Sequence, residues 1–234
     1  MRVPLTTLAL LWLPLSLAAQ ESWTPARLER GQPPPTPVVA VAGGEVFLEL
    51  TVAATGAVVR ADTLRTTPPF TDAVLSTVRG WSFRPAERTT ERITGSPPAI
   101  VTELVTEPVE SKVLVVAIYR PPSLLAPTLG NPPRNIASAS AEVAFPRTTT
   151  TPGYPPLALY DGTVLMEIAV GRDGRVADVA VLQSAAGFDQ AALDAARQWT
   201  FQPARVAGLP EQAYAYVVMV FRQPVTSAPV PPGR

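Results

Sequence analysis

The chain has 234 residues, of which 47% are hydrophobic and 16% charged, a composition typical of a folded protein. It contains no cysteine and no histidine, which excludes disulfides, a Ser-His-Asp triad, a cysteine nucleophile and a zinc site built on imidazole or thiolate. Because 19 basic residues balance 19 acidic ones, we expect no strong electrostatic attraction to nucleic acid or to an anionic membrane.

The first residues are typical of a secretory signal peptide. Arg2 supplies a short positive region, an apolar stretch follows, and small residues at 16 and 18 fit cleavage after Ala18 or Ala19. This pattern predicts export, with residues 1–19 removed. The alternative is an uncleaved membrane anchor, although the apolar stretch is short for a span and is interrupted by Pro14.

The rest of the chain contains one unit twice. A shift of 118 positions aligns residues 44–86 with 162–204 without a gap, and 15 of the 43 aligned positions are identical. Most of these identities are apolar, aromatic, glycine or proline, so the pattern predicts a duplicated domain rather than a duplicated active site. Proline-rich segments at 32–37, 121–156 and 224–234 are interpreted as a tether, a spacer and a tail outside the core.

Each unit begins with a predicted pair of strands. Apolar residues alternate over 46–52 and 164–170, which is typical of half-buried strands. A turn at Asp173-Gly174 then leads into a strand at 175–182. The apolar alternation in this second strand is out of phase after Val176, which requires a bulge.

A helix and a closing strand complete each unit. Aromatic and small apolar residues recur at three- and four-residue steps over 70–81 and 188–199, which indicates an amphipathic helix. The closing strands are expected at 112–120 and 214–222, and the longer connection in the first unit leaves room for an extra strand near 99–105. The Trp-x-Phe-x-Pro-Ala segments supply the predicted core aromatics Trp81, Phe83, Trp199 and Phe201.

The second unit contains a series of spaced motifs, in the order Tyr154-Pro155-Pro156, Asp173-Gly174-Arg175-Val176, Leu193-Asp194-Ala195-Ala196, Trp199-Thr200-Phe201-Gln202-Pro203-Ala204-Arg205 and Gly208-Leu209-Pro210. In these motifs and their order, the unit resembles the TonB C-terminal domain family over about seventy residues. The first unit resembles a degenerate copy, which keeps the Trp-x-Phe-x-Pro-Ala segment but lacks the turn aspartate and inserts a loop.

The resemblance implies a small two-layer α+β domain in the periplasm. We therefore expect two tandem β-β-α-β domains, each an antiparallel sheet with one packed helix, joined by a proline-rich linker. The expected bounds are a signal peptide at 1–19, a proline-rich segment at 20–42, the degenerate repeat at 43–122, a linker at 123–152, the family-like domain at 153–223 and a tail at 224–234.

In that family the domain binds a segment of an outer-membrane receptor by adding a strand to the edge of its sheet. The resemblance makes the final strand, 214–222, the expected edge. The partner is expected to be an outer-membrane receptor or a separate anchored transducer, without coupling to a motor, because the histidine-bearing inner-membrane helix of a complete transducer is missing. The candidate partner contacts are Gln183, Tyr214, Tyr216, Val218 and Val220.

Two other functions are open. In the first, the protein is a structural or self-associating envelope component whose repeats form an intramolecular pseudo-dimer, and protected backbone amides over 214–222 would favour it. In the second, the protein is an enzyme that uses carboxylates such as Glu49 and Glu167. We interpret these two residues as a solvated strand face, so we expect no catalytic residue, metal, cofactor, small-molecule substrate or nucleic acid.

Overall fold

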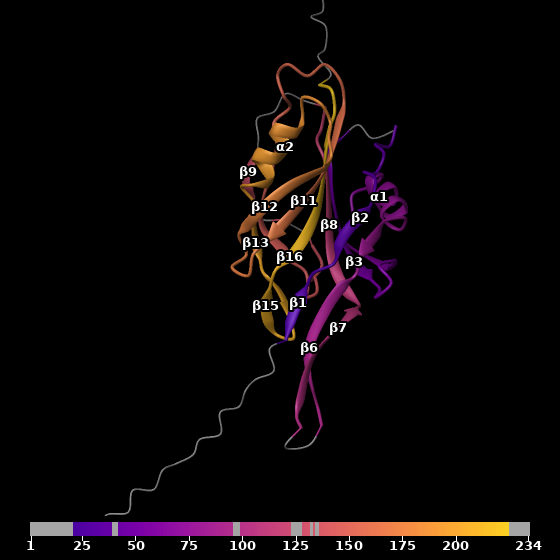
Figure 1. Cartoon of the computed structure of the whole chain (residues 1–234). Helices are drawn as coiled ribbons and strands as arrows, with labels where there is room; N and C mark the ends of the chain where they lie inside the picture. The colour runs from indigo at the N-terminus through magenta and orange to yellow at the C-terminus, as the bar shows by residue number, and fades with distance from the viewer. Residues whose placement is uncertain are drawn as a thin grey trace, which may run out of the picture.

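The computed structural model describes residues 21–38, 42–95, 99–122, 128–131, 133 and 136–224 (Figure 1). The expected signal peptide at 1–19 and nearly all of the expected tail lie outside these residues. The described part is mostly β-strand with two helices, so the predicted α+β class is confirmed. Neither helix has the length and hydropathy that crossing a bilayer demands, within the ranges given above.

Both halves of the chain contain the same series of elements. The first half contains β1 (Ser22–Thr24), β2 (Arg27–Arg30), β3 (Gly44–Val52), β4 (Val58–Arg65), α1 (Phe70–Val78), β5 (Ser82–Arg84), β6 (Ala86–Thr94), β7 (Val101–Val109) and β8 (Ser111–Tyr119). The second half contains β9 (Thr128–Asn131), β10 (Phe145–Thr151), β11 (Gly162–Val170), β12 (Val176–Gln183), α2 (Asp189–Ala196), β13 (Thr200–Gln202), β14 (Ala204–Val206), β15 (Leu209–Glu211) and β16 (Ala213–Phe221).

The repeated unit begins earlier than the aligned residues indicate. The indole Nε1 of Trp81 donates to the carbonyl of Gln32 at 3.0 Å, and Trp199 donates to Thr150, also at 3.0 Å. Both acceptors lie 49 residues before their tryptophan. Strand β2 pairs with β5 as β10 pairs with β13, in the same register and with the same irregularity. Each unit therefore starts with a strand. In the first half this strand lies in the expected proline-rich segment 20–42, and in the second half it lies in the proline-rich segment 121–156.

The interpretation of the proline-rich segments as non-core is therefore wrong for part of them. Pro34 and Pro146 are buried, and so are Val143 and Ala144. Pro146 lies in the short strand β10 opposite Phe201 of β13, whereas Pro34 lies between β2 and β3, outside any strand.

The two halves share one six-stranded sheet, in the order β12-β11-β16-β8-β3-β4. The closing strands β8 and β16 lie side by side at its centre and pair in parallel, from Leu114↔Ala215 to Tyr119↔Val220. Two separate sheets, one in each of two tandem domains, are therefore not what the chain forms. This arrangement matches the intramolecular pseudo-dimer geometry.

The helices cover opposite faces of this sheet (Figure 1). Helix α2 packs on a core that also contains Phe47 and Leu114 of the first half. Helix α1 packs on a core that also contains Leu165 and Tyr216 of the second half. Because each core draws residues from both halves, burial of apolar surface holds the halves together. The aromatics expected in the core are all at most 3% exposed, and they are Trp81, Phe83, Trp199 and Phe201.

The bulge required by the sequence is present in β12. The pairing with β11 shifts between Ala169 and Val170, which leaves Ala177 as the extra residue, and a second shift lies near Leu182. Strand β4 has the same two shifts against β3. The predicted bulge is confirmed. Because the same shifts occur in β4, the two outer strands of the sheet have the same local geometry. Strand β7 fills the longer connection of the first half, where the sequence leaves room for an extra strand.

Candidate protein-binding edge

The final strand is not an edge, and that expectation is wrong. Strand β16 pairs with β11 on one side and with β8 on the other, so its backbone is occupied in both directions. Tyr216, Val218 and Val220 are at most 1% exposed. The half-buried Tyr214 lies beneath the guanidinium of Arg27, 5.4 Å from the ring centre to Cζ. These four candidate contacts are not on a free edge.

The sequence does contain a sign of this arrangement. Residues 113–119 and 213–221 are almost entirely apolar, without the alternation of a strand that has one wet face. Such runs are typical of strands buried on both faces. The resemblance pointed to an edge, whereas the composition of these two strands indicates the centre of a sheet.

The outer strands of the sheet are β12 and β4. Gln183, the remaining candidate contact, is exposed at the end of β12. Among the described residues, the outer side of β12 makes no backbone hydrogen bond along its length. The corresponding side of β4 is partly closed, because Ala137 N donates to Leu64 O at 2.8 Å. The outer strand of the second half thus has the more open edge.

The two bulges limit what β12 can pair with. Between them, residues 178–181 are in continuous register with β11. Asp178 in this stretch is exposed and the next three residues are half-buried. Bulges shorten an edge and discourage unspecific strand pairing, so this edge suits a short extended segment rather than another long strand.

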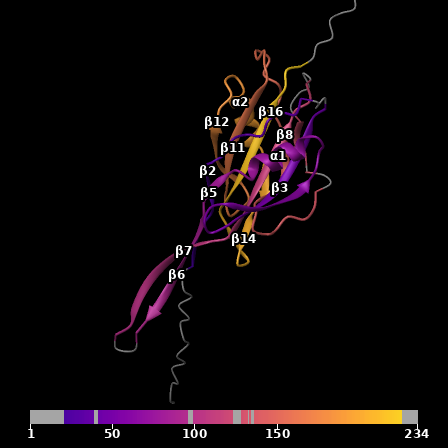
Figure 2. The same ribbon diagram turned by 90° about the vertical axis from the view of Figure 1, so that its right-hand side faces the viewer.

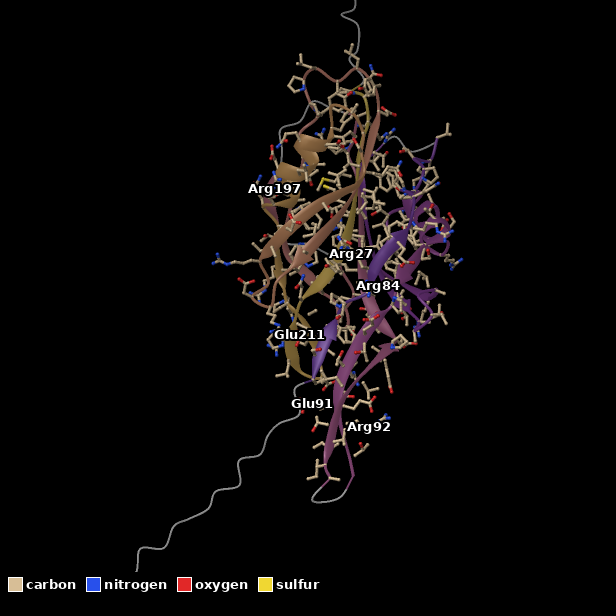
Figure 3. All side chains as sticks on the ribbon, in the orientation of Figure 1. Arg27, Arg84, Glu91, Arg92, Arg197 and Glu211 are labelled. Carbon is tan, nitrogen blue, oxygen red and sulfur yellow. The ribbon has the colours of Figure 1, made fainter. Side chains whose placement is uncertain are left out.

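Glu167 is buried between the two halves, which overturns its assignment to a solvated strand face. Its side chain is 4% exposed and accepts hydrogen bonds from Arg27 Nε at 3.0 Å and from the Tyr216 hydroxyl at 3.0 Å. The same hydroxyl accepts from the backbone N–H of Leu28 at 2.7 Å. Hydrogen bonding to Glu167 raises the pKa of Arg27, and burial raises the pKa of Tyr216. Figure 3 shows Arg27 near the middle of the molecule, where the halves meet.

Glu49, its counterpart in the first half, is also buried rather than solvated. The carboxylate accepts from Lys112 Nζ at 2.8 Å and from the backbone N–H of Ser140 at 2.7 Å. The hydrogen bond to Glu49 raises the pKa of Lys112. Ser140 lies in the segment that leads into the second half, so this carboxylate also joins the two halves. Both glutamates are engaged in structural contacts rather than in a cleft.

Within the described ranges, no cluster of three or more acidic residues is arranged to hold a metal ion. The sheet combines an open outer strand with carboxylates that are buried in contacts between the halves. An open outer strand is a feature of domains that bind a partner by strand addition.

Residues 151–222 match the family model of the Gram-negative bacterial TonB protein C-terminal. This segment contains β11 to β16, and the match confirms for it the resemblance seen in the sequence. The match spans about a third of the chain and does not include the first half. Comparison with curated proteins and with solved structures finds no match.

Proposed function

We propose that this protein is an exported, non-catalytic envelope protein that binds an extended segment of another protein by strand addition to β12. The observation that carries the proposal is the unoccupied outer side of β12 in the family-matched half. An exposed edge offers unpaired N–H and C=O groups, and an extended peptide satisfies them with main-chain hydrogen bonds.

The proposed partner is the periplasmic end of an outer-membrane receptor, as the family resemblance implies. The match of residues 151–222 to the family supports a protein partner in general. The resemblance implied β16 as the binding edge, but β16 is paired with β8, and a receptor segment would have to displace β8 to reach it. We therefore propose β12 instead. The proposed location is the periplasm, and we propose that binding occurs without coupling to a motor.

A photocrosslinker tests the proposal at two matched positions. Ala177 on β12 and Val59 on β4 are the bulge residues of their strands, and both are exposed. Irradiation in the native envelope, followed by mass spectrometry, should capture the periplasmic end of a receptor from position 177 and not from position 59. Equal capture from the two positions, or none from position 177, would contradict the proposal.

Proline substitution gives an independent test on the same strand. In an antiparallel ladder, successive residues direct their backbone N–H groups to opposite sides. We therefore compare two variants, Val179→Pro and Ala180→Pro. One of them removes an N–H on the outer side of β12, and the other removes an N–H that bonds to β11. The variant that keeps the parental melting temperature should lose the crosslinked partner. Retention of the partner in that folded variant would rule out strand addition at β12.

A second candidate function is a structural one, in which the intramolecular pseudo-dimer itself is the functional unit. The parallel pairing of β8 with β16 and the mixed cores favour it. A protease site placed within residues 123–127 allows the chain to be cut between the halves. We expect the two fragments to co-elute after cleavage. Separation of folded fragments without denaturant would contradict this candidate.

A further inference from the structure

A two-stranded arm projects from the body of the molecule (Figure 2). It consists of β6 and β7, which pair in register from Ala86↔Val109 to Thr94↔Val101. In the second half, the same position holds only the short hairpin of β14 and β15. The arm is therefore an addition specific to the first half and lies outside the family-matched segment.

Other strands pair with the arm only at its base, although a two-stranded hairpin needs a further strand or layer for stability. Strand β1 pairs with β6 only at its base, from Ser22↔Thr89 to Thr24↔Glu87. Among the described residues, no strand pairs with the outer side of β7. Apolar side chains on the arm are exposed, with Ile93 at 68% and Leu104 at 65%. Two-stranded hairpins are marginal in water without a further strand or layer, so the outer side of β7 is suited to a partner.

Charges on one face of the arm alternate from strand to strand. Arg88 and Arg92 on β6 lie opposite Glu107 and Glu103 on β7, and opposite residues share a face. On the other side of β6, Glu21 forms an ion pair with Arg88 at 2.9 Å. Arg88 therefore has an acidic residue on each side, Glu21 just before β1 and Glu107 on β7. A basic strand beside β7 continues this alternation.

The side chains on this face of β7 determine which spacing of basic residues fits in an added strand. Alternate residues of a strand share one face, and on β7 these are Val101, Glu103, Val105, Glu107 and Val109. Among the described residues Glu103 makes no ion pair, and Glu107 makes only a long one of 3.9 Å with Arg92. Two basic side chains four residues apart, with an apolar one between them, fit this face. Pro108 has no N–H to donate to an added strand, so we take residues 101–107 as the pairing stretch.

We propose that the outer edge of β7 binds an extended segment of a partner protein that carries Lys or Arg at positions i and i+4 and an apolar residue at i+2. A second copy of this chain fits less well, because the charged residues of β7 are all acidic and an antiparallel β7–β7 pair centred on Val105 sets Glu103 opposite Glu107. This site is separate from β12 and does not depend on binding there.

The test uses the full mature chain and two synthetic peptides, Thr-Lys-Thr-Val-Thr-Lys-Thr and the same sequence with Glu in place of Lys. Backbone amide shifts in NMR locate the binding site. We expect the Lys peptide to shift amides of residues 101–107 and the Glu peptide to leave them unchanged. The double variant Glu103→Lys/Glu107→Lys should weaken binding of the Lys peptide by about tenfold or more and gain binding of the Glu peptide.

A matched control has the same net charge. The variant Glu91→Lys/Glu110→Lys changes one residue on the opposite face of the arm and one beyond the end of β7, so it should keep the binding of the Lys peptide. Figure 3 shows Glu91 and Arg92 on opposite sides of the arm. Shifts at 178–181 instead of 101–107 would overturn the β7 site while leaving the β12 proposal standing.

Three other results would overturn the proposal. One is equal binding of the two peptides. The second is a concentration-dependent dimer in ultracentrifugation that Glu103→Lys/Glu107→Lys disrupts, since a second copy would then occupy the edge. The third is binding to phosphatidylcholine vesicles that Ile93→Ser/Leu104→Ser abolishes and the charge variant does not, since lipid would then cover the arm.

Discussion

Arg27 and Glu167 are 140 residues apart in the chain and form an ion pair with two donor nitrogens. Arg27 Nε lies 3.0 Å from one carboxylate oxygen and 3.2 Å from the other, and Nη2 lies 2.9 Å from the first. Arg27 belongs to β2 of the first half and Glu167 to β11 of the second. The carboxylate side chain is 4% exposed, whereas the arginine side chain is 58% exposed. The burial of the acceptor makes this contact more consequential than a surface ion pair.

Replacement of this buried carboxylate should be destabilising. Glu167→Ala removes the acceptor of the buried Tyr216 hydroxyl, and we expect a loss of about 1–3 kcal/mol in the free energy of unfolding. Urea denaturation measures it. Asp62→Ala breaks the exposed pair with Arg60 and should cost at most about 1 kcal/mol. Equal losses in the two variants would show that Glu167 does not join the halves energetically.

The shared sheet predicts one cooperative unfolding transition. Trp81→Ala and Trp199→Ala truncate buried aromatics in different halves, and each should lower the stability by about 3–5 kcal/mol. Because both cores contain residues of both halves, each variant should move a single thermal transition, recorded by calorimetry. Leu157→Ala, at a side chain that is 94% exposed, should leave the transition in place. Two resolved transitions in either tryptophan variant would contradict the shared fold.

The turn glycines differ in what a methyl group would meet. Gly174 has a φ of +78°, and a Cβ there would clash with the carbonyl oxygen of Phe201. Gly208 has a φ of +82°, but nothing lies within 4 Å of its Cβ position. Gly174→Ala should therefore destabilise the protein clearly more than Gly208→Ala, which costs only about 1 kcal/mol for the left-handed backbone. Chemical denaturation of the two variants gives the comparison, and equal costs would show that the turn relaxes away from Phe201.

Alkaline pH should destabilise the fold through its buried tyrosines. Burial raises the pKa of Tyr216 above its ordinary value of about 10, and the same cause raises the pKa of Tyr119. Folding then favours the neutral phenol, so this stabilisation is complete below about pH 10 and is lost as the pH rises further. Tyr216→Phe should show a shallower loss of stability than the parent between about pH 9 and 11. Tyr160→Phe, at an exposed ring, is the control, and parallel pH profiles of Tyr216→Phe and the parent would refute the assignment.

The local structure was largely predictable because it depends on neighbours in the chain. The turn at Gly174, the amphipathic stripe of α2 and the need for a bulge after Val176 are all visible as short patterns. The duplication was visible because core positions recur at a constant spacing. The opening strands β2 and β10 were missed because they share no identical residue at the spacing of 118. Strand β10 also contains Pro146, and proline ordinarily argues against a strand.

The candidate site was less predictable because it depends on which edge stays open. Gln183 lies on an outer strand, but the four candidates on β16 lie at the centre of the sheet. The alternation within 164–170 places Glu167 on the face of β11 opposite to helix α2. Only the contact with Arg27 shows that the first half covers this face.

The sequence by itself determined the α+β class, the repeat and the order of elements within it, since propensity, turn chemistry and periodicity act over a few residues. Tertiary structure alone decided that the closing strands pair with one another. That pairing joins residues about a hundred positions apart, and it is stabilised by burial of two apolar strands on both faces. Because β16 is occupied in this way, the outer strands of the six-stranded sheet are β12 and β4.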